Sequence, residues 1–235
     1  MAGEKDLVVY IFENRPHPLA PTFEGWLRES RRFKAFAEQY KDKIRRKLRT
    51  LPNERARLED LRFELEIAYR LHREASFVVA YEPGAALKGR SPDFTVTYKT
   101  HTHFNVEATR MQIAAADTSP EVGITPLAYK LIEMTCDKVG QMQPGLVNVL
   151  MTTAERAATE DEMKAAMTAL RLMAERKAEA FFVAHGFKDA AAFIRQFRSL
   201  SAIGYINGGA LWLNSLAKHP LSKEMAAAMR RVIAQ

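Results

Sequence analysis

Two acidic residues, Asp93 and Glu107, lie in short segments in which apolar and polar residues alternate. Alternation with a period of two predicts half-buried strands, here over residues 93–97 and 103–109, joined by a polar turn. If the strands pair as a hairpin, the two acids share one face of it. Two carboxylates at close quarters repel each other and need a cation, a shared proton or solvent. Oxygen ligands of this kind suit Mg²⁺ or Mn²⁺, although a surface hairpin with acids on its solvent-exposed face has the same spacing.

A third acid, Glu64, lies on a predicted helix over residues 54–73. It has hydrophobic residues three positions before it and three, four and seven positions after it, which places it on the apolar face of the helix. Glu66, by contrast, has Arg62 and Arg70 four residues to either side, which is typical of ion pairs at a solvated surface. A carboxylate on an apolar face is costly unless a cation or hydrogen bonds reach it. We therefore expect Glu64 beside the two strand acids.

The elements that must position these acids predict an α/β fold. The helix over 54–73 is followed by a predicted strand over 77–81, by the hairpin, and by a helix over 126–142. The apolar residues 146–151 then form a strand that lies parallel to its neighbour, because a helix crosses between the two. The remaining predicted elements are a strand over 6–12, helices over 23–48, 159–183, 189–198 and 222–233, and a hairpin around Asn207-Gly208-Gly209.

The chain has 235 residues, of which 47% are hydrophobic and 27% charged, a composition typical of a globular protein with a substantial core. We expect one α/β domain over 53–235, preceded by a basic helical extension over 1–52. No apolar run approaches the roughly 20 residues that a membrane span needs, and no signal peptide is evident. The single cysteine, Cys136, fits a reducing compartment. These features predict a cytoplasmic protein with no membrane partner.

The net charge of +7 points to a polyanionic partner, and one segment carries it. Between Arg28 and Arg49 there are ten basic residues and three acids, so this segment alone (10 − 3 = +7) equals the formal excess of the chain. A helix with an aromatic stripe docks by that stripe and directs its cations outward. The candidates for contacts to nucleic-acid phosphates, those of DNA above all, are Arg45, Arg46 and Lys47 on this helix and Lys88 and Arg90 in a later loop. A solvated basic face is the alternative.

The acids and their neighbours together resemble a known family. Glu64 in a helix, Pro92-Asp93 at the start of a strand and Glu107-Ala108-Thr109 in the next strand resemble the motif of the PD-(D/E)xK nuclease superfamily, which has the restriction-endonuclease-like fold. The resemblance covers residues from about 61 to 150. It implies a mixed central sheet flanked by helices, with the N-terminal basic helical extension and a C-terminal hairpin plus helix added to it. The chain departs from the motif at Thr109, where the family has a lysine.

The resemblance also implies roles for particular residues. The implied metal ligands for Mg²⁺ or Mn²⁺ are Asp93, Glu107 and Glu64, and the implied catalytic residues are these three with Thr109, Lys138 and Gln141. A lysine three residues before a glutamine on the helix after the motif resembles a variant of the superfamily in which that helix supplies the missing lysine. A lysine whose alkyl chain lies on apolar surface and whose charge reaches solvent has the same pattern.

The expected function is that of a divalent-metal-dependent nuclease, which hydrolyses phosphodiester bonds of DNA above all, or of a protein derived from such a nuclease. The alternative is a catalytically inactive module of the same fold that binds nucleic acid or a protein partner, and the neutral Thr109 supports it. The sequence contains no Walker loop, dinucleotide-binding fingerprint, paired Cys/His zinc spacing or serine nucleophile elbow. The oligomeric state stays open, a homodimer included.

Overall fold

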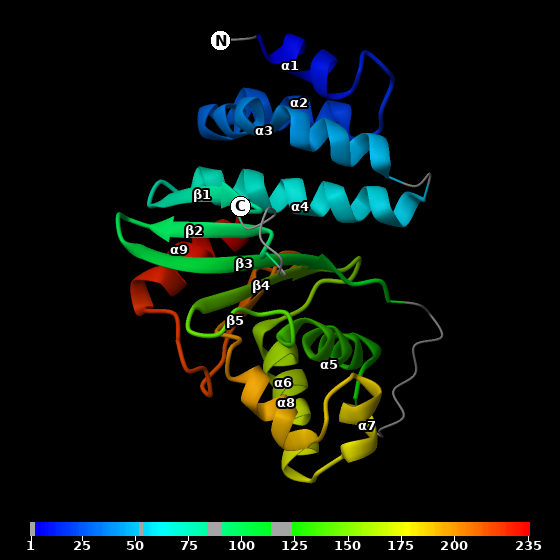
Figure 1. The fold of residues 1–235 in the computed structure, drawn as a ribbon, viewed down its shortest axis with the longest axis vertical. Helices are drawn as coiled ribbons and strands as arrows, with labels where there is room; N and C mark the ends of the chain where they lie inside the picture. Colours follow the sequence, from blue (N-terminus) through cyan, green and yellow to red (C-terminus); the bar gives the residue numbers. More distant parts are fainter. Residues whose placement is uncertain (1–2, 52–53, 84–90, 114–123) are drawn as a thin grey trace.

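The computed structural model describes residues 3–51, 54–83, 91–113 and 124–235. Within these ranges the chain forms an α/β fold around an open mixed sheet of six strands, shown in Figure 1. The strands follow one another across the sheet in chain order: β1 (Phe77–Tyr81), β2 (Phe94–Tyr98), β3 (Thr102–Arg110), β4 (Val147–Thr153), β5 (Ala202–Tyr205) and β6 (Ala210–Leu213). The β1–β2, β2–β3 and β5–β6 pairs are antiparallel, and the β3–β4 and β4–β5 pairs are parallel.

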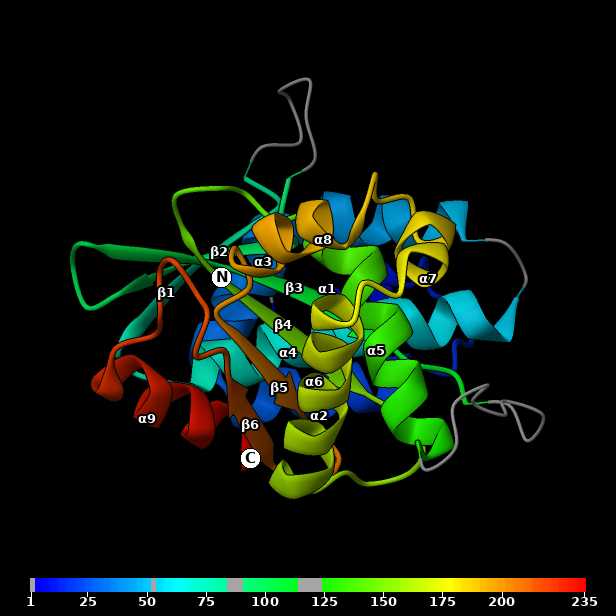
Figure 2. The ribbon, with the colours of Figure 1, turned by 90° about the horizontal axis from the view of Figure 1, so that it is seen from below.

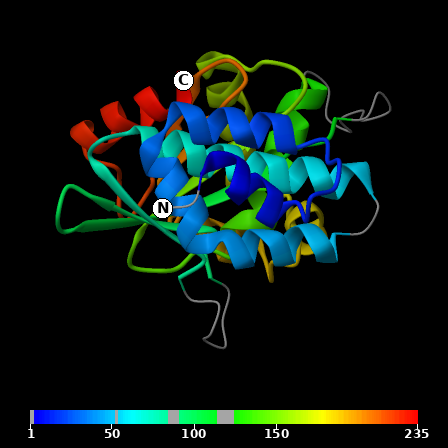
Figure 3. The same cartoon turned by 90° about the horizontal axis from the view of Figure 1, so that it is seen from above.

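Helices cover both faces of the sheet. One face packs against α4 (Arg55–Arg73) and α9 (Lys223–Ile233). The other packs against α5 (Pro126–Val139), α6 (Glu160–Glu175) and α8 (Ala190–Phe197), with α7 (Glu179–Ala184) against α8, as Figure 2 shows. The helices α1 (Glu4–Ile11), α2 (Ala20–Glu29) and α3 (Arg31–Thr50) form a further layer outside α4 (Figures 1 and 3). Alternate residues of the strands therefore supply two separate hydrophobic clusters, one on each face.

The β2–β3 hairpin has the alternation that the sequence predicts. Phe94 pairs with Val106, and both side chains are fully buried on the α4 side of the sheet. Because successive side chains of a strand point to opposite faces, Asn105 and Glu107 point toward α5. The chain then crosses through α5 to β4, which pairs with β3 in the predicted parallel direction. The hairpin and the crossover together place Glu107 between the sheet and α5.

The layer formed by α1, α2 and α3 is bound closely to the rest of the molecule. Its buried side chains share one hydrophobic cluster with α4 and the sheet. Along the outer edge of β1, the side chain of Arg32 donates a hydrogen bond to the carbonyl oxygen of Phe77. Lys43 donates to the carbonyl oxygen of Tyr81, whose N–H donates to the Tyr40 hydroxyl. Side chains of α3 therefore cover the edge of β1 that no other described strand pairs.

The prediction of a strand over 6–12 is wrong, because these residues belong to helix α1. A short apolar run fits a buried strand and a buried helix equally well. Here the side chain of Asp6 accepts a hydrogen bond of 3.0 Å from Gly3 N, which caps the helix at its start. Leu7 and Ile11, four residues apart, are then buried on the same face of the helix.

Two predicted helices are each divided in two. The helix predicted over 23–48 ends as α2 and restarts as α3, because Ser30 is extended (φ −132°) and its side chain accepts a hydrogen bond of 3.1 Å from Phe33 N. The helix predicted over 159–183 ends as α6 and resumes as α7, with Lys177 between them in the left-handed region (φ 56°). A third, predicted over 126–142, ends three residues earlier, at Val139.

The other predicted elements are confirmed to within one or two residues. They are α4, β1, α8 and α9 and the hairpin of β5 and β6, in which Gly208 and Gly209 have φ values of 121° and 70°. None of the described helices is both long enough and apolar enough to cross a membrane. The coarse prediction of an α/β fold with a mixed sheet flanked by helices is therefore confirmed.

Candidate functional site

Asp93 lies at the end of the sheet, immediately before β2. Continuing the β2–β3 register by one residue brings it opposite Glu107. Its Oδ2 accepts a hydrogen bond of 2.8 Å from Ala108 N, so the carboxyl group lies against β3. Burial, and then the negative charges of Glu107 and Glu64, raise the pKa of Asp93 to about 7. The negative charges of Glu107 and of the helix acid Glu64 therefore both act on Asp93.

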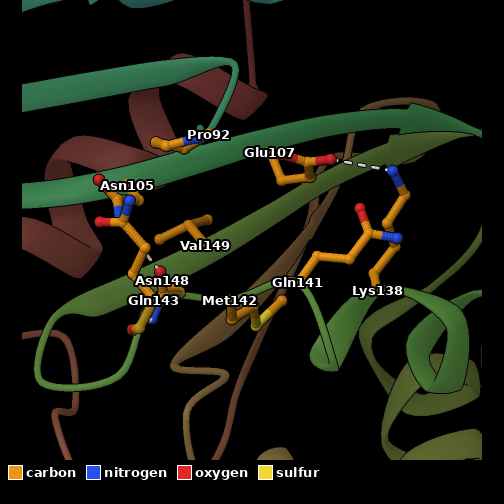
Figure 4. A pocket seen from close by; sticks show the side chains of 9 residues that line it. All are labelled: Pro92, Asn105, Glu107, Lys138, Gln141, Met142, Gln143, Asn148 and Val149. Carbon is orange, nitrogen blue, oxygen red and sulfur yellow. Dashed lines mark hydrogen bonds and ion pairs between the residues drawn. The ribbon is translucent and has the colours of Figure 1, made fainter. Parts of the chain in front are cut away.

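Glu107 is paired with a lysine from the crossover helix. Figure 4 shows the ion pair of Lys138 on α5 with Glu107. Lys138 Nζ lies 2.9 Å from Glu107 Oε1, and each side chain is 22% exposed. Lys138 follows the buried Leu131 and Met134 by seven and four residues, so it starts from the packed face of α5. Its alkyl chain crosses that face and carries the ammonium to the strand. The helical spacing of Leu131, Met134 and Lys138 predicts that the lysine reaches Glu107 or Asp93, and in the structure it reaches Glu107.

A small pocket opens beside this ion pair, as Figure 4 shows. Its walls include Asn105 and Glu107 from β3, Lys138 from α5 and Gln141 just after α5. Gln141 is held at the wall by a hydrogen bond of 3.0 Å from its Nε2 to Asp137 O. The pocket has room of about 20 Å³ for water-sized molecules, which suits a single water. A carboxylate and an ammonium therefore flank a space in which one water can lie.

The helix acid joins an acidic cluster that includes a residue the sequence did not predict. Carboxylate oxygens of Glu64, Glu82 and Asp93 all lie within 4.8 Å of one another. Glu82 follows β1 and is tied to the start of β2, because Glu82 N donates a hydrogen bond of 2.8 Å to Asp93 O. Periodicity could not identify Glu82, since it lies in the turn after the strand. The one feature of the sequence that could have indicated Glu82 is its position directly after the predicted strand over 77–81, at the end of the sheet where the predicted site lies.

Two lysines of α3 enter the same acidic cluster. Lys47 Nζ lies 2.5 Å from an oxygen of Glu64 and 2.5 Å from an oxygen of Glu82, and Lys43 Nζ lies 2.7 Å from the second oxygen of Glu82. Burial alone would lower the pKa of Lys47, but the charges and hydrogen bonds of Glu64 and Glu82 raise it above its usual value. Tyr81 also donates a hydrogen bond to Glu64. Lys47 thus points into the cluster and not toward solvent.

The remaining predicted residues are spread more widely. Arg46 is exposed on α3, whereas Arg45 is ion-paired with Glu13 at 2.9 Å. Lys88 and Arg90 lie outside the described residues. Thr109 and Lys138 line a second, larger groove of about 1300 Å³ past the carboxyl ends of β3 and β4. At the boundary between parallel strands and a crossover helix, such an edge is where α/β proteins commonly bind ligands.

Asp93 and Glu107 each keep one carboxylate oxygen of the kind that a divalent cation prefers. One oxygen of Asp93 accepts from Ala108 N and one oxygen of Glu107 accepts from Lys138. Among the described residues, the other oxygen of each carboxyl group has no hydrogen bond, and carboxylate oxygens are the ligands that Mg²⁺ and Mn²⁺ prefer. Glu82 differs, because an ammonium group occupies each of its two oxygens.

The arrangement combines a pair of acids suited to a hard cation, an ammonium beside them, a pocket for one water and an adjoining groove. These are the components that hydrolysis of a charged ester requires. Comparisons of the chain with family models, with curated proteins and with solved structures find no match.

Proposed function

We propose that this protein is a divalent-metal-dependent nuclease that hydrolyses phosphodiester bonds in DNA. The observation that carries the proposal is the meeting of Asp93, Glu107 and Lys138 at one end of the β2–β3 hairpin. The order of elements from α4 through β1, β2, β3 and α5 to β4 also supports a restriction-endonuclease-like core, with the acids at the positions that the motif gives them. Asp93 and Glu107 would hold Mg²⁺ or Mn²⁺.

The metal would polarise the scissile phosphate and lower the pKa of a bound water. The chain's own residues supply the rest. Glu107 orients Lys138 through their ion pair, and Lys138 directs an ammonium toward the place where charge develops on the phosphate oxygens. Thr109, two residues after Glu107, shares its side of β3 and offers a neutral hydroxyl group at the mouth of the groove. Gln141 borders the pocket that fits one water.

The electrostatics of Asp93 favour this assignment. Its carboxyl group is half-buried, and the loss of solvent and the neighbouring acids make its negative form costly, which is why its pKa is raised to about 7. A bound divalent cation removes that cost, because it attracts every one of these carboxylates. The proton on Asp93 and the metal therefore compete for the same group. Without a bound cation, the ionised form of Asp93 would lower the free energy of unfolding.

The substrate proposal rests on charge and on the adjoining groove. The chain carries a net charge of +7, and α3 directs exposed cations such as Arg46 to its surface. Arg55 and Arg62 of α4 line the groove that reaches Lys138. Cations of this kind bind nucleic acid by displacing counterions from its phosphates. DNA lying along the groove would bring a phosphate to Lys138, whose ammonium contacts Glu107.

A catalytically inactive module of the same fold is the second candidate. The observation in its favour is Thr109, which supplies no positive charge where the motif has a lysine. In that case the fold would bind nucleic acid or a protein partner without hydrolysing it.

A cleavage assay tests the proposal directly. Plasmid and single-stranded DNA are incubated with Mn²⁺ and the wild-type protein, and with the variants Asp93→Asn and Glu107→Gln. We expect the wild type to cut and the variants to lose at least about a hundredfold in rate, because loss of charge stabilisation commonly costs that much. Glu66→Gln is the matched control, since Glu66 lies on α4 but pairs with Arg70 at 2.8 Å, away from the site. DNA binding by the wild type with no cleavage under any of these conditions would favour the inactive module.

A further inference from the structure

The acidic cluster already contains a cation that belongs to the chain. Lys47 Nζ lies 2.5 Å from Glu64 Oε1 and 2.5 Å from Glu82 Oε1, and 4.9 Å from the centre of the Tyr81 ring. Such short contacts between charged partners are the stronger kind of hydrogen bond. A metal ion held between Glu64 and Glu82 would need the space that this ammonium fills.

The packing of α3 fixes the ammonium there. The helix departs from helical geometry at Tyr40 (φ −109°, ψ 15°), and Ile44 in its second half is fully buried. Lys43 and Lys47 are four residues apart and therefore share the helix face that meets β1. Two like charges at this spacing repel each other, but Glu82 lies between them and accepts a contact from each. The two lysines and Glu82 thus form a single fixed unit.

The charges divide the acids into two groups. Glu64 and Glu82 carry two negative charges, and Lys43 and Lys47 carry two positive charges, so these four groups balance (−2 + 2 = 0). Asp93 is not part of that balance, because among the described residues its carboxyl group accepts a hydrogen bond only from a backbone N–H. The negative charge that remains available to a metal is therefore on the side of the cluster that faces β3.

We propose that Lys47 takes the place of a second metal ion, so that the protein binds one divalent cation at Asp93 and Glu107. Removing the Lys47 ammonium would open a second cation site between Glu64 and Glu82. Lys47 is a positioning residue, since it acts through Glu64 and Glu82 and lies outside the pocket beside Glu107. This inference rests on the proposed function, because it takes the metal at Asp93 and Glu107 as given. If Lys47 has this role, α3 contributes directly to the metal site.

The number of bound ions tests this inference without any measurement of cleavage. Mn²⁺ is titrated calorimetrically, and free Mn²⁺ is counted by electron paramagnetic resonance, for the wild type and for Lys47→Met. We expect one ion for the wild type and two for the variant. Arg46→Met is the matched control. It removes one positive charge from the exposed residue that precedes Lys47 on α3, and we expect this variant to bind one ion. The double variant Lys47→Met with Glu64→Gln returns the count from two to one.

Loss of folding is checked separately. Circular dichroism shows whether Lys47→Met is folded, and Lys47→Gln, which keeps a hydrogen-bond donor, replaces it if it is not. Mn²⁺ is also expected to raise the melting temperature of the Lys47 variant more than that of the wild type, because the ion binds at two places in the folded state.

The outcomes separate the two proposals. One ion in both proteins, two ions in the wild type, or fewer ions in the variant than in the wild type would each overturn the role of Lys47 and leave the nuclease proposal standing. No ion in either protein would overturn the nuclease proposal, and the role of Lys47 with it. If the wild type bound no ion and the variant bound one, Lys47 would indeed exclude a cation from the site between Glu64 and Glu82. The proposal of a metal-dependent nuclease would then be overturned.

Discussion

Lys138 and Glu107 are 31 positions apart in the chain, yet Lys138 Nζ and Glu107 Oε1 lie 2.9 Å apart. The strand that carries Glu107 has no lysine two residues later, where Thr109 stands. The helix α5 thus supplies the ammonium group of Lys138 to the Glu107 carboxylate, in place of a lysine on the strand itself. Both side chains remain partly exposed, Lys138 at the groove and at the small pocket and Glu107 at the small pocket, so a ligand can reach them.

Replacing Lys138 by methionine should remove the charge and keep most of the alkyl chain. We expect the rate of Mn²⁺-dependent DNA cleavage to fall by about 10²–10³, because one preorganised charge is lost from the transition state. DNA affinity should change little, since a single phosphate contact contributes a small part of it. Rates come from single-turnover cleavage and affinities from fluorescence anisotropy. Lys164→Met, at an exposed lysine of α6, is the control, and equal rates for wild type and Lys138→Met would refute the role.

The affinity for Mn²⁺ should depend on pH through Asp93. Its pKa is raised to about 7, so below that pH the metal must displace a proton. We expect the apparent affinity to rise about tenfold for each pH unit up to neutrality and to level off above it, as loss of one proton requires. Calorimetry in two buffers of different ionisation enthalpy measures the proton released. A pH-independent affinity between pH 5 and 7, with no proton released, would contradict the assignment.

Without metal, Asp93 should make the fold less stable as pH rises. Its pKa in the folded protein, about 7, lies above the ordinary value of 3.8, so the folded state binds the proton more tightly than the unfolded state does. The stabilising contribution is therefore fully present below about pH 4 and is lost as pH rises through about 7. The slope for one proton is at most about 1.4 kcal/mol per pH unit. Urea denaturation in the presence of a chelator, at pH 5 and pH 8, should show this decline in the wild type and not in Asp93→Asn.

Exposed cations of α3 should set the salt dependence of DNA binding. Arg46 is exposed, so Arg46→Ala should weaken binding and reduce the slope of log affinity against log salt concentration by about one unit. Arg45→Ala should have a smaller effect, because Arg45 is already paired with Glu13. The slopes come from anisotropy titrations at several salt concentrations. If Arg46→Ala leaves the affinity and slope of the wild type unchanged, the charge of this helix serves solvation alone.

The periodicity of hydrophobic residues in the sequence predicted the elements whose structure depends on residues close together in the chain. The alternation around Asp93 and Glu107 predicted a hairpin with both acids on one face, and the helical period of α5 predicted that Lys138 would reach Glu107 or Asp93. The strand predicted over 6–12 failed because a short apolar run does not distinguish a strand from a helix.

Tertiary packing determined what the sequence could not show. Glu82 lies in a turn, where no periodicity marks a residue, and it meets Glu64 only because α4 packs over β1. The aromatic stripe of α3 correctly predicted a docked helix. It could not show how the helix is rotated on β1, and that rotation turns Lys47 inward while Arg46 stays in solvent.

The contacts that Arg32, Tyr40 and Lys43 make along β1 have a consequence for any attempt to shorten the chain. A polypeptide starting at residue 54 would keep the whole sheet but would expose the outer row of peptide groups of β1, a template on which strands of other molecules can add. It would also uncover the apolar surface of α4 that the N-terminal helices now cover. The helices α1, α2 and α3 therefore prevent intermolecular strand pairing, and a shortened protein should precipitate or form oligomers.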